Sequence, residues 1–292
     1  MTKKASTLLF LLVLVLFCLP TIFPLFKSGY FYSHDGIVHA ARFAKFHEAL
    51  TDGQFPPRWA NGLSFNLGSP AIMFYGFLPN LASEIPFFFT SSYSNSIEII
   101  FGLSLLLSSF SFFIFAKKLT SSNFAALSGA VLYTWAPYRM VDIYVRGAFP
   151  ESFIFIFPPL LFWSVNEIGD KHGYRRILVA AFSIAAMVLS HTVLALGFIA
   201  LFLAYVLYLS FNNPRKKVIV YSLVSVILGL LISSFFWLPA VWESRKIHSE
   251  ILTQLAVYRT NFVPLVRLLY SRWGFGIVNS NNSLATHIGL PQ

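Results

Sequence analysis

The stretch ASTLLFLLVLVLFCLPTIFPLF, residues 5–26, decides the fold class of this chain. It carries no charged residue, and it is long enough to cross a membrane, because a helix needs about 20 apolar residues to do so. Two lysines precede it, as in a secretory signal peptide, but no small-x-small cleavage site follows it. We therefore predict an uncleaved first transmembrane span.

The composition extends this reading to the whole chain. Hydrophobic residues make up 57% and charged residues 11%, whereas a soluble domain carries about 25% charged residues. The net charge of +10 would suggest nucleic acid for a soluble protein, but the positive-inside rule explains it here, so we predict no nucleic-acid partner. The single cysteine, Cys18, excludes an intrachain disulfide and a zinc cluster built from thiolates.

The fold class predicted is all-α, a polytopic transmembrane helical bundle of about seven spans. The predicted spans are 5–26, 97–116, 123–138, 152–168, 176–191, 193–211 and 218–240. The stretch 69–89 is also long and apolar, but it contains Pro70, Pro79, Pro86 and Glu84. Because proline removes a backbone donor and disfavours helix before it, we predict that this stretch is interfacial or re-entrant.

The distribution of charge predicts the orientation. If residues 69–89 do not span, the basic clusters all fall on one side, which the positive-inside rule makes cytoplasmic. These clusters are Lys3/Lys4, Lys117/Lys118, Lys171/Arg175/Arg176 and Arg215/Lys216/Lys217. The N-terminus is then inside, and the external segments are a first loop, residues 27–95, with amphipathic or re-entrant helices, and residues 241–292. Most acidic residues lie in these external segments, so we expect any chemistry there.

The first external loop contains a dense polar segment, SHDGIVHAARFAKFHEALTDGQFPPRW, residues 33–59. As a helix capped by Ser33, it places Asp35, His39 and Arg42 on one face. We interpret these three as candidate catalytic residues, because a carboxylate can accept a proton from an acceptor hydroxyl while a cation stabilises a phosphate leaving group. The alternative is an amphipathic helix lying on lipid headgroups. Two histidines beside the carboxylate could bind a divalent metal, but no metal-specific spacing is present, so no cofactor is predicted.

A second polar segment, APYRMVDIYVRGAFPES, covers residues 136–152. Its arginines and acids predict a pocket for phosphate or pyrophosphate, or alternatively snorkelling arginines that are each offset by an acid. A histidine in LSHT lies at the outer end of a predicted span, where a polar residue indicates a site or a helix-end hydrogen bond to a carbonyl. The candidate substrate-binding residues are His34, Arg139, Asp142, Arg146, Glu151 and His191.

Five motifs occur in a specific order: HDGIVHAARFAKFHEALTDGQFPPRW, LGSPAIMFYGFLPN, PYRMVDIYVRGAFPES, LSHT and FWLPAVWE. In this order they resemble bacterial multi-spanning proteins labelled as related to 6-pyruvoyl-tetrahydropterin synthase, over most of residues 1–245. Those proteins look like relatives of the GT-C glycosyltransferase superfamily. The resemblance implies an acidic catalytic or acceptor-positioning residue after the first span, which is Asp35 with its neighbour His34. Arg146 and Glu151 match the second external motif.

The hypothesis that follows is a membrane glycosyltransferase in the bacterial plasma membrane. It would move a sugar from a polyprenyl-phosphate donor in the bilayer to an external glycan or protein acceptor of the cell envelope. A transporter or lipid-handling protein would carry ionisable residues in mid-span, and almost none occur there. A non-catalytic subunit or remnant stays open. Because the family members resembled have more spans, we expect residues 1–292 to be a single membrane domain that is incomplete at its C-terminus.

Overall fold

The computed structural model describes residues 3–27, 29–167, 173–212, 216–246, 262–276 and 284–289. Within these ranges every regular element is a helix. The one strand-like pairing there is an isolated bridge, in which Ala60 and Ser69 exchange two backbone hydrogen bonds of 2.8 and 3.1 Å. The predicted all-α fold class is confirmed.

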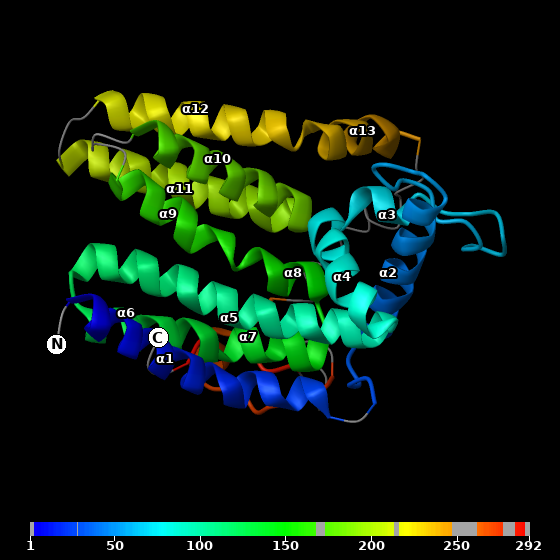
Figure 1. The fold of residues 1–292 in the computed structure, drawn as a ribbon, viewed down its shortest axis with the longest axis horizontal. Helices are drawn as coiled ribbons and strands as arrows, with labels where there is room; N and C mark the ends of the chain where they lie inside the picture. Colours follow the sequence, from blue (N-terminus) through cyan, green and yellow to red (C-terminus); the bar gives the residue numbers. More distant parts are fainter. Residues whose placement is uncertain are drawn as a thin grey trace.

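Long apolar helices form the body of the bundle and run roughly along its longest axis (Figure 1). They are α1 (Lys3–Ile22), α5 (Tyr93–Thr120), α10 (Gly173–Ser190), α11 (Thr192–Asn212) and α12 (Lys216–Ile232). By length and composition the described residues contain four helices able to cross a membrane. The pair formed by α12 and α13 (Ser234–Ser244), bent by 68°, is a possible fifth.

Two of the predicted spans, 123–138 and 152–168, are interrupted, so the described residues do not reach about seven spans by this criterion. The first region contains α6 (Asn123–Trp135) and the start of α7 (Pro137–Val141), which a short π-helix (Asp142–Arg146) follows. The second divides into α8 (Phe149–Ile154) and α9 (Phe157–Glu167). Pro137 and Pro158 explain the breaks, because each lies in the first turn of the following helix and has no amide to donate to the carbonyl four residues earlier. The pieces still pack in the bundle, α6 against α1 and α5, and α9 against α5 and α10.

The first loop contributes a group of helices at one end of the bundle, which we call the loop end (Figure 1). These helices are α2 (Gly36–Thr51), α3 (Ala71–Phe74) and α4 (Phe77–Thr90). With 14 residues, α4 is about 21 Å long, which is shorter than the hydrocarbon core of about 30 Å. A helix of this length suits the interfacial or re-entrant setting predicted for residues 69–89, which remains a prediction.

The opposite end, which we call the basic end, holds the start of α1 and the end of α5 (Figure 1). Lys117 Nζ donates to Thr7 Oγ1 at 2.6 Å, and Asn123 Nδ2 donates to Ser6 Oγ at 3.2 Å. The guanidinium of Arg176, in the first turn of α10, lies 4.1 Å from the ring centroid of Trp163 on α9. Basic residues from distant parts of the sequence therefore gather at the end opposite to the first loop.

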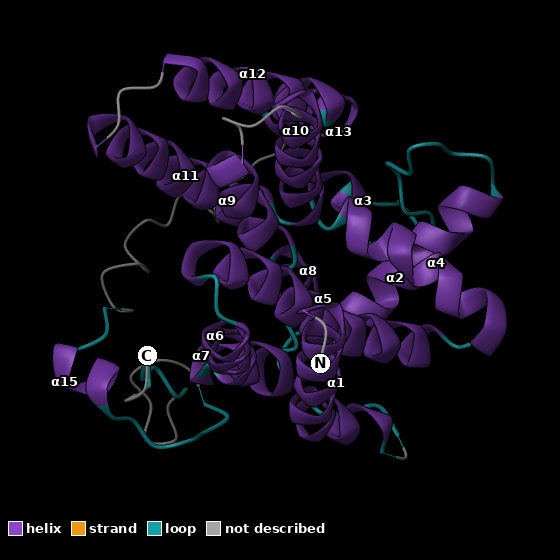
Figure 2. Ribbon diagram, turned by 60° about the vertical axis from the view of Figure 1, so that its left-hand side comes forward, coloured by secondary structure: helices purple, strands orange, loops and turns teal. Residues whose placement is uncertain are grey.

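The C-terminal part of the described chain returns to the bundle beside α6 and α7 (Figure 2). It contains a short helix, α15 (Leu265–Leu269). Ala285 packs against Val141 and Val145 of the second polar segment. The carbonyl oxygen of Phe275 lies 2.6 Å from His34 Nε2. These contacts place residues of the predicted external segment 241–292 next to both polar segments.

Candidate functional site

The two polar segments meet through their backbones at the loop end. The amide of His34 donates to the carbonyl oxygen of Val145 at 2.9 Å, and the amide of Asp35 donates to that of Arg146 at 2.8 Å. Gly147 makes this approach possible. It has a φ of +65°, and a Cβ at this position would collide with Ser33 Oγ and lie 2.9 Å from the Gly36 nitrogen. The segments that the sequence predicted as one site are thus directly joined.

The helix of the first segment begins later than predicted. It starts at Gly36 with Asp35 in the N-cap position, and no side-chain cap hydrogen bond forms. The predicted N-cap, Ser33, is wrong. Its side chain is buried, and its Oγ has no hydrogen-bond partner in the described chain. This leaves the Asp35 side chain exposed at the tip of α2, one helical turn before His39.

A tyrosine brings the face of α2 together with the end of α10. The ring of Tyr75 stacks on His39 with centroids 5.9 Å apart, and it makes an edge contact with His191 at 5.2 Å. The guanidinium carbon of Arg42 lies 5.3 Å from the centroid of the same ring. Tyr75 therefore assembles three of the predicted site residues, although sequence reasoning did not select it. Its only signal was its place in the motif LGSPAIMFYGFLPN.

The His39 imidazole is neutral in this setting. Its side chain is almost fully buried, and burial, together with the nearby Arg42 charge and His191, lowers its pKa to about 3. The pKa of Tyr75 is raised to about 12, first by burial and then by Glu151, against the effect of Arg42. Tyr75 thus lies within electrostatic reach of both polar segments.

The second segment forms a compact ionic cluster, which we call the Arg146 cluster, consisting of Tyr138, Asp142, Arg146 and Glu151. Arg146 Nη1 lies 3.1 Å from Asp142 Oδ1, and Nη2 lies 2.8 Å from Glu151 Oε2. The Tyr138 hydroxyl donates to Glu151 Oε1 and accepts from Arg146 Nη1 at 3.3 Å. Two carboxylates therefore already surround this guanidinium.

Burial shapes the charges of this cluster. Asp142 is fully buried, and its Oδ2 has no hydrogen-bond partner in the described residues. Burial and the adjacent Glu151 raise the pKa of Asp142, and Arg146 only partly opposes them. Burial alone would lower the pKa of Arg146, but the hydrogen bond to Glu151 and the Asp142 carboxyl raise it overall. The Arg146 guanidinium is thus a permanent charge that holds the two acids in place.

Arg139 has a different environment from Arg146. Only 2% of its surface is exposed. Its Nη1 donates to the Ser152 carbonyl at 3.0 Å, its Nη2 donates to Ser108 Oγ at 3.2 Å, and its Cζ lies 4.4 Å from the Phe155 ring centroid. These contacts connect α7 with α5 and α8. Its role in phosphate binding stays a prediction.

Arg42 is the cation best placed to meet an anion. It is half-buried, and no carboxylate of the described residues forms an ion pair with it. Its guanidinium lies over the face of the Tyr75 ring. A guanidinium that is partly shielded from water and not neutralised by the protein interacts strongly with phosphate.

A cavity of about 450 Å³ lies at the loop end. Arg58, Trp59, Met73 and Phe74 from the first loop line it, together with Glu243 of α13. Phe74 directly precedes Tyr75, so one short segment lines the cavity and also contacts the polar residues. The Trp59 indole lies against Gly68, where a Cβ would collide with it, and Trp59 is 45% exposed. The cavity therefore combines an aromatic ring with charged groups.

In the described part of the chain, no group of three or more His, Cys, Asp or Glu residues is arranged to hold a metal ion. His34, which the sequence grouped with Asp35 and His39, is exposed, and its imidazole contacts the Phe275 carbonyl. The His39 side chain instead lies inside the protein against Tyr75. The three candidate ligands are therefore separated by burial.

The chain is similar to known membrane proteins. The model of the 6-pyruvoyl-tetrahydropterin synthase related domain, described as a membrane protein, matches residues 72–288. A relative from Lactococcus lactis subsp. cremoris, named only as an uncharacterized protein, is 27% identical over 291 residues, which cover 94% of this chain and 47% of the relative. The chain thus spans about half the length of that relative. The family resemblance predicted from the ordered motifs is confirmed, and the chain belongs to the 6-pyruvoyl-tetrahydropterin synthase related family of membrane proteins.

Proposed function

We propose that this protein is a membrane glycosyltransferase of the GT-C type. It transfers a sugar from a polyprenyl-phosphate donor to a cell-envelope acceptor at the external face of the plasma membrane. The observation that supports this most is the hydrogen bond from the Asp35 amide to the Arg146 carbonyl, 2.8 Å long. Through it an exposed carboxylate and the cations of two distant segments share one end of a membrane bundle.

The proposed reaction uses few groups. The Asp35 carboxylate, which is exposed at the tip of α2, accepts the proton of the acceptor hydroxyl as the oxygen bonds to the anomeric carbon of the sugar. The bond from that carbon to the phosphate oxygen breaks, and Arg42 stabilises the charge on the departing polyprenyl phosphate. Tyr75 supports Arg42 through its ring face. In this scheme the Arg146 cluster keeps the two segments in register.

The cavity beside Tyr75 is the proposed acceptor site. The Trp59 indole offers a flat apolar face to a sugar ring, and the side chains of Arg58 and Glu243 at the same cavity can hydrogen-bond to hydroxyls. Because Phe74 lines the cavity and the neighbouring Tyr75 contacts Arg42, the proposal places a bound acceptor on the Arg42 side of the cavity. The donor's polyprenyl chain would remain in the bilayer, between helices.

The test is sugar transfer from a radiolabelled polyprenyl-phosphate sugar in membranes that contain the full chain. We expect Asp35→Asn and Arg42→Gln each to lower the rate at least about 100-fold, the usual size of a general-base or charge-stabilisation effect. The matched control is Asp52→Asn at the other end of α2, which should retain the wild-type rate. Wild-type transfer by both site variants would remove the assignment.

A second candidate is a non-catalytic membrane subunit. The observation that favours it is the neutralisation of Arg146 by Asp142 and Glu151, which leaves Arg42 as the main cation for a donor phosphate. This reading predicts that Asp35→Asn leaves transfer in whole cells unchanged, whereas breaking the Arg146 cluster lowers the amount of assembled protein.

A further inference from the structure

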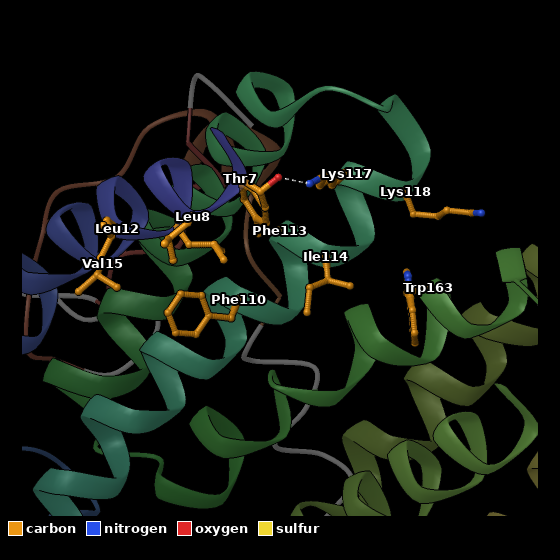
Figure 3. A pocket seen from close by; sticks show the side chains of 11 residues that line it. Thr7, Leu8, Leu12, Val15, Phe110, Phe113, Ile114, Lys117, Lys118 and Trp163 are labelled. Carbon is orange, nitrogen blue, oxygen red and sulfur yellow. Dashed lines mark hydrogen bonds between the residues drawn. The ribbon is translucent and has the colours of Figure 1, made fainter. Parts of the chain in front are cut away.

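A second cavity, of about 750 Å³, lies at the basic end, away from the candidate site at the loop end (Figure 3). Leu8, Leu12 and Val15 of α1 line it on one side, and Phe110 and Ile114 of α5 line it on another. Its volume falls in the range of about 300–1,000 Å³ that is typical of small-molecule sites. The glycosyltransferase proposal does not use this space.

The cavity has one charged end and one apolar end. Lys117 and Lys118, in the last turn of α5, lie at the charged end, and the walls below them are hydrocarbon. From Phe110 to Lys117 the helix rises about 10 Å. This depth is about two thirds of one leaflet of a hydrocarbon core about 30 Å thick. The geometry matches a molecule with an anionic head and an acyl chain.

Lys117 can serve such a head group. Lys117 Nζ donates to Thr7 Oγ1 at 2.6 Å, and an ammonium has three donors, so two remain. No acidic side chain lines the cavity in the described residues. Lys118 and Trp163 lie at the same rim of the cavity (Figure 3). The Arg176 guanidinium also lies over the Trp163 ring. Charge complementarity therefore selects an anion over a neutral zwitterion.

The apolar side chains that line the cavity are partly exposed. Leu8 is 60% exposed, Leu12 is 56% exposed and Ile114 is 42% exposed. Together with the buried Phe113 and the half-buried Phe110, they form a continuous strip that leads away from the lysines. A single acyl chain lying along this strip would cover side chains of both α1 and α5.

We infer that this cavity binds one anionic phospholipid, with its phosphate at Lys117 and Lys118 and one acyl chain along α1 and α5. The inference is independent of the proposed transfer reaction. Each lysine near an anionic lipid contributes an electrostatic attraction that a zwitterionic lipid largely lacks. The bound lipid would also join α1 to α5 at the basic end.

Native mass spectrometry of the purified full chain tests this inference. The protein is mixed with equal amounts of phosphatidylglycerol and phosphatidylcholine that carry identical acyl chains. We expect the wild type to retain one phosphatidylglycerol with at least about tenfold preference. The double variant Lys117→Gln/Lys118→Gln should lose this preference. The control Lys216→Gln/Lys217→Gln removes an exposed pair of lysines outside the cavity and should keep it.

A cavity-filling variant provides an independent readout. Leu12→Trp keeps both lysines but occupies the path of the acyl chain, so it should lower the retention of both lipids. The inference is overturned if the wild type shows no preference or if the Lys216/Lys217 control loses the preference to the same degree. It is also overturned if Leu12→Trp binds phosphatidylglycerol as the wild type does.

Discussion

Asp35 and Arg146 are joined by a backbone hydrogen bond of 2.8 Å, although they belong to different loops. Because the bond involves main-chain atoms, it does not depend on the side chains that would perform chemistry. The junction can therefore be weakened while both side chains are kept. The contribution of the junction to stability can thus be measured separately from the contribution of the charged side chains.

The first prediction concerns Gly147, which sits in this junction. In Gly147→Ala the added Cβ meets Ser33 Oγ and the Gly36 nitrogen while the residue also holds a positive φ of +65°. We expect the free energy of unfolding to fall by more than about 2 kcal/mol, because left-handed strain alone costs about 1–2 kcal/mol. Denaturant titration of the purified protein in detergent measures this change.

Gly53→Ala is the matched control for this substitution. Gly53 also has a positive φ, +86°, but nothing lies within 4 Å of the position of its Cβ. The free energy of unfolding of Gly53→Ala should fall only by the cost of the backbone strain. Equal losses in the two variants would mean that the close approach of the two loops is unimportant for stability.

The second prediction concerns the ion pairs of Arg146. Replacing Arg146 by Met leaves Asp142 and Glu151 without the cation that they face. Breaking a buried pair from one side costs about 3–5 kcal/mol, so we expect a loss near the lower end, because Arg146 is partly exposed. Unfolding free energies in detergent again provide the measurement.

The exposed pair Lys246–Glu243, with an N–O distance of 3.0 Å, gives the comparison for Arg146→Met. Lys246→Met should change stability by less than about 1 kcal/mol, as is usual for surface ion pairs. Adding Glu151→Gln to Arg146→Met should recover part of the loss, since it removes one unpaired charge. If the stability loss of the double variant equals the sum of the losses of the two single variants, Arg146 and Glu151 do not stabilise each other.

The third prediction concerns pH and His39. The folded protein holds the pKa of this imidazole near 3, below its ordinary value of 6.5, mainly through burial. Below about pH 6.5 the unfolded chain binds a proton at His39 that the folded chain does not, so stability falls as the pH drops toward 3. From pH 7 to pH 5 the protonation of His39 in the unfolded chain therefore lowers the free energy of unfolding by about 2 kcal/mol.

His39→Gln should therefore show a smaller decrease in unfolding free energy between pH 7 and pH 5 than the wild type. The matched control is His34→Gln, which removes an exposed imidazole from the same loop and should follow the wild-type curve. A His39→Gln curve with the wild-type slope would show that this imidazole is not held neutral.

The fourth prediction concerns sidedness. Phe65, in the first loop, is fully exposed at 101%, and Lys217 is exposed at the start of α12. In intact cells an impermeant maleimide should label Phe65→Cys, whereas Lys217→Cys should react only after the membrane is opened. The natural Cys18 is buried, so it adds little background. Labelling of both positions from outside would contradict the predicted orientation.

Much of the general architecture was predictable because it follows from composition and local pattern. Uninterrupted apolar runs such as residues 5–26 predicted membrane helices, and α1, α5, α10 and α11 are long enough to span. The prolines of residues 69–89 predicted a segment unlike a simple span. Prolines also interrupt residues 123–138 and 152–168, at Pro137 and Pro158, so the predicted count of about seven spans is not confirmed.

The sequence alone determined that this chain is an all-α membrane protein of its family, with its polar residues concentrated in two segments, because hydrophobicity and motif order are local properties. Only the tertiary structure decided which of those residues meet. It placed Tyr75 between His39, Arg42 and His191, paired Arg146 with Asp142 and Glu151, and buried Arg139. Side-chain partnership depends on close packing between segments that are distant in the chain, and residue spacing within one segment carries no information about it.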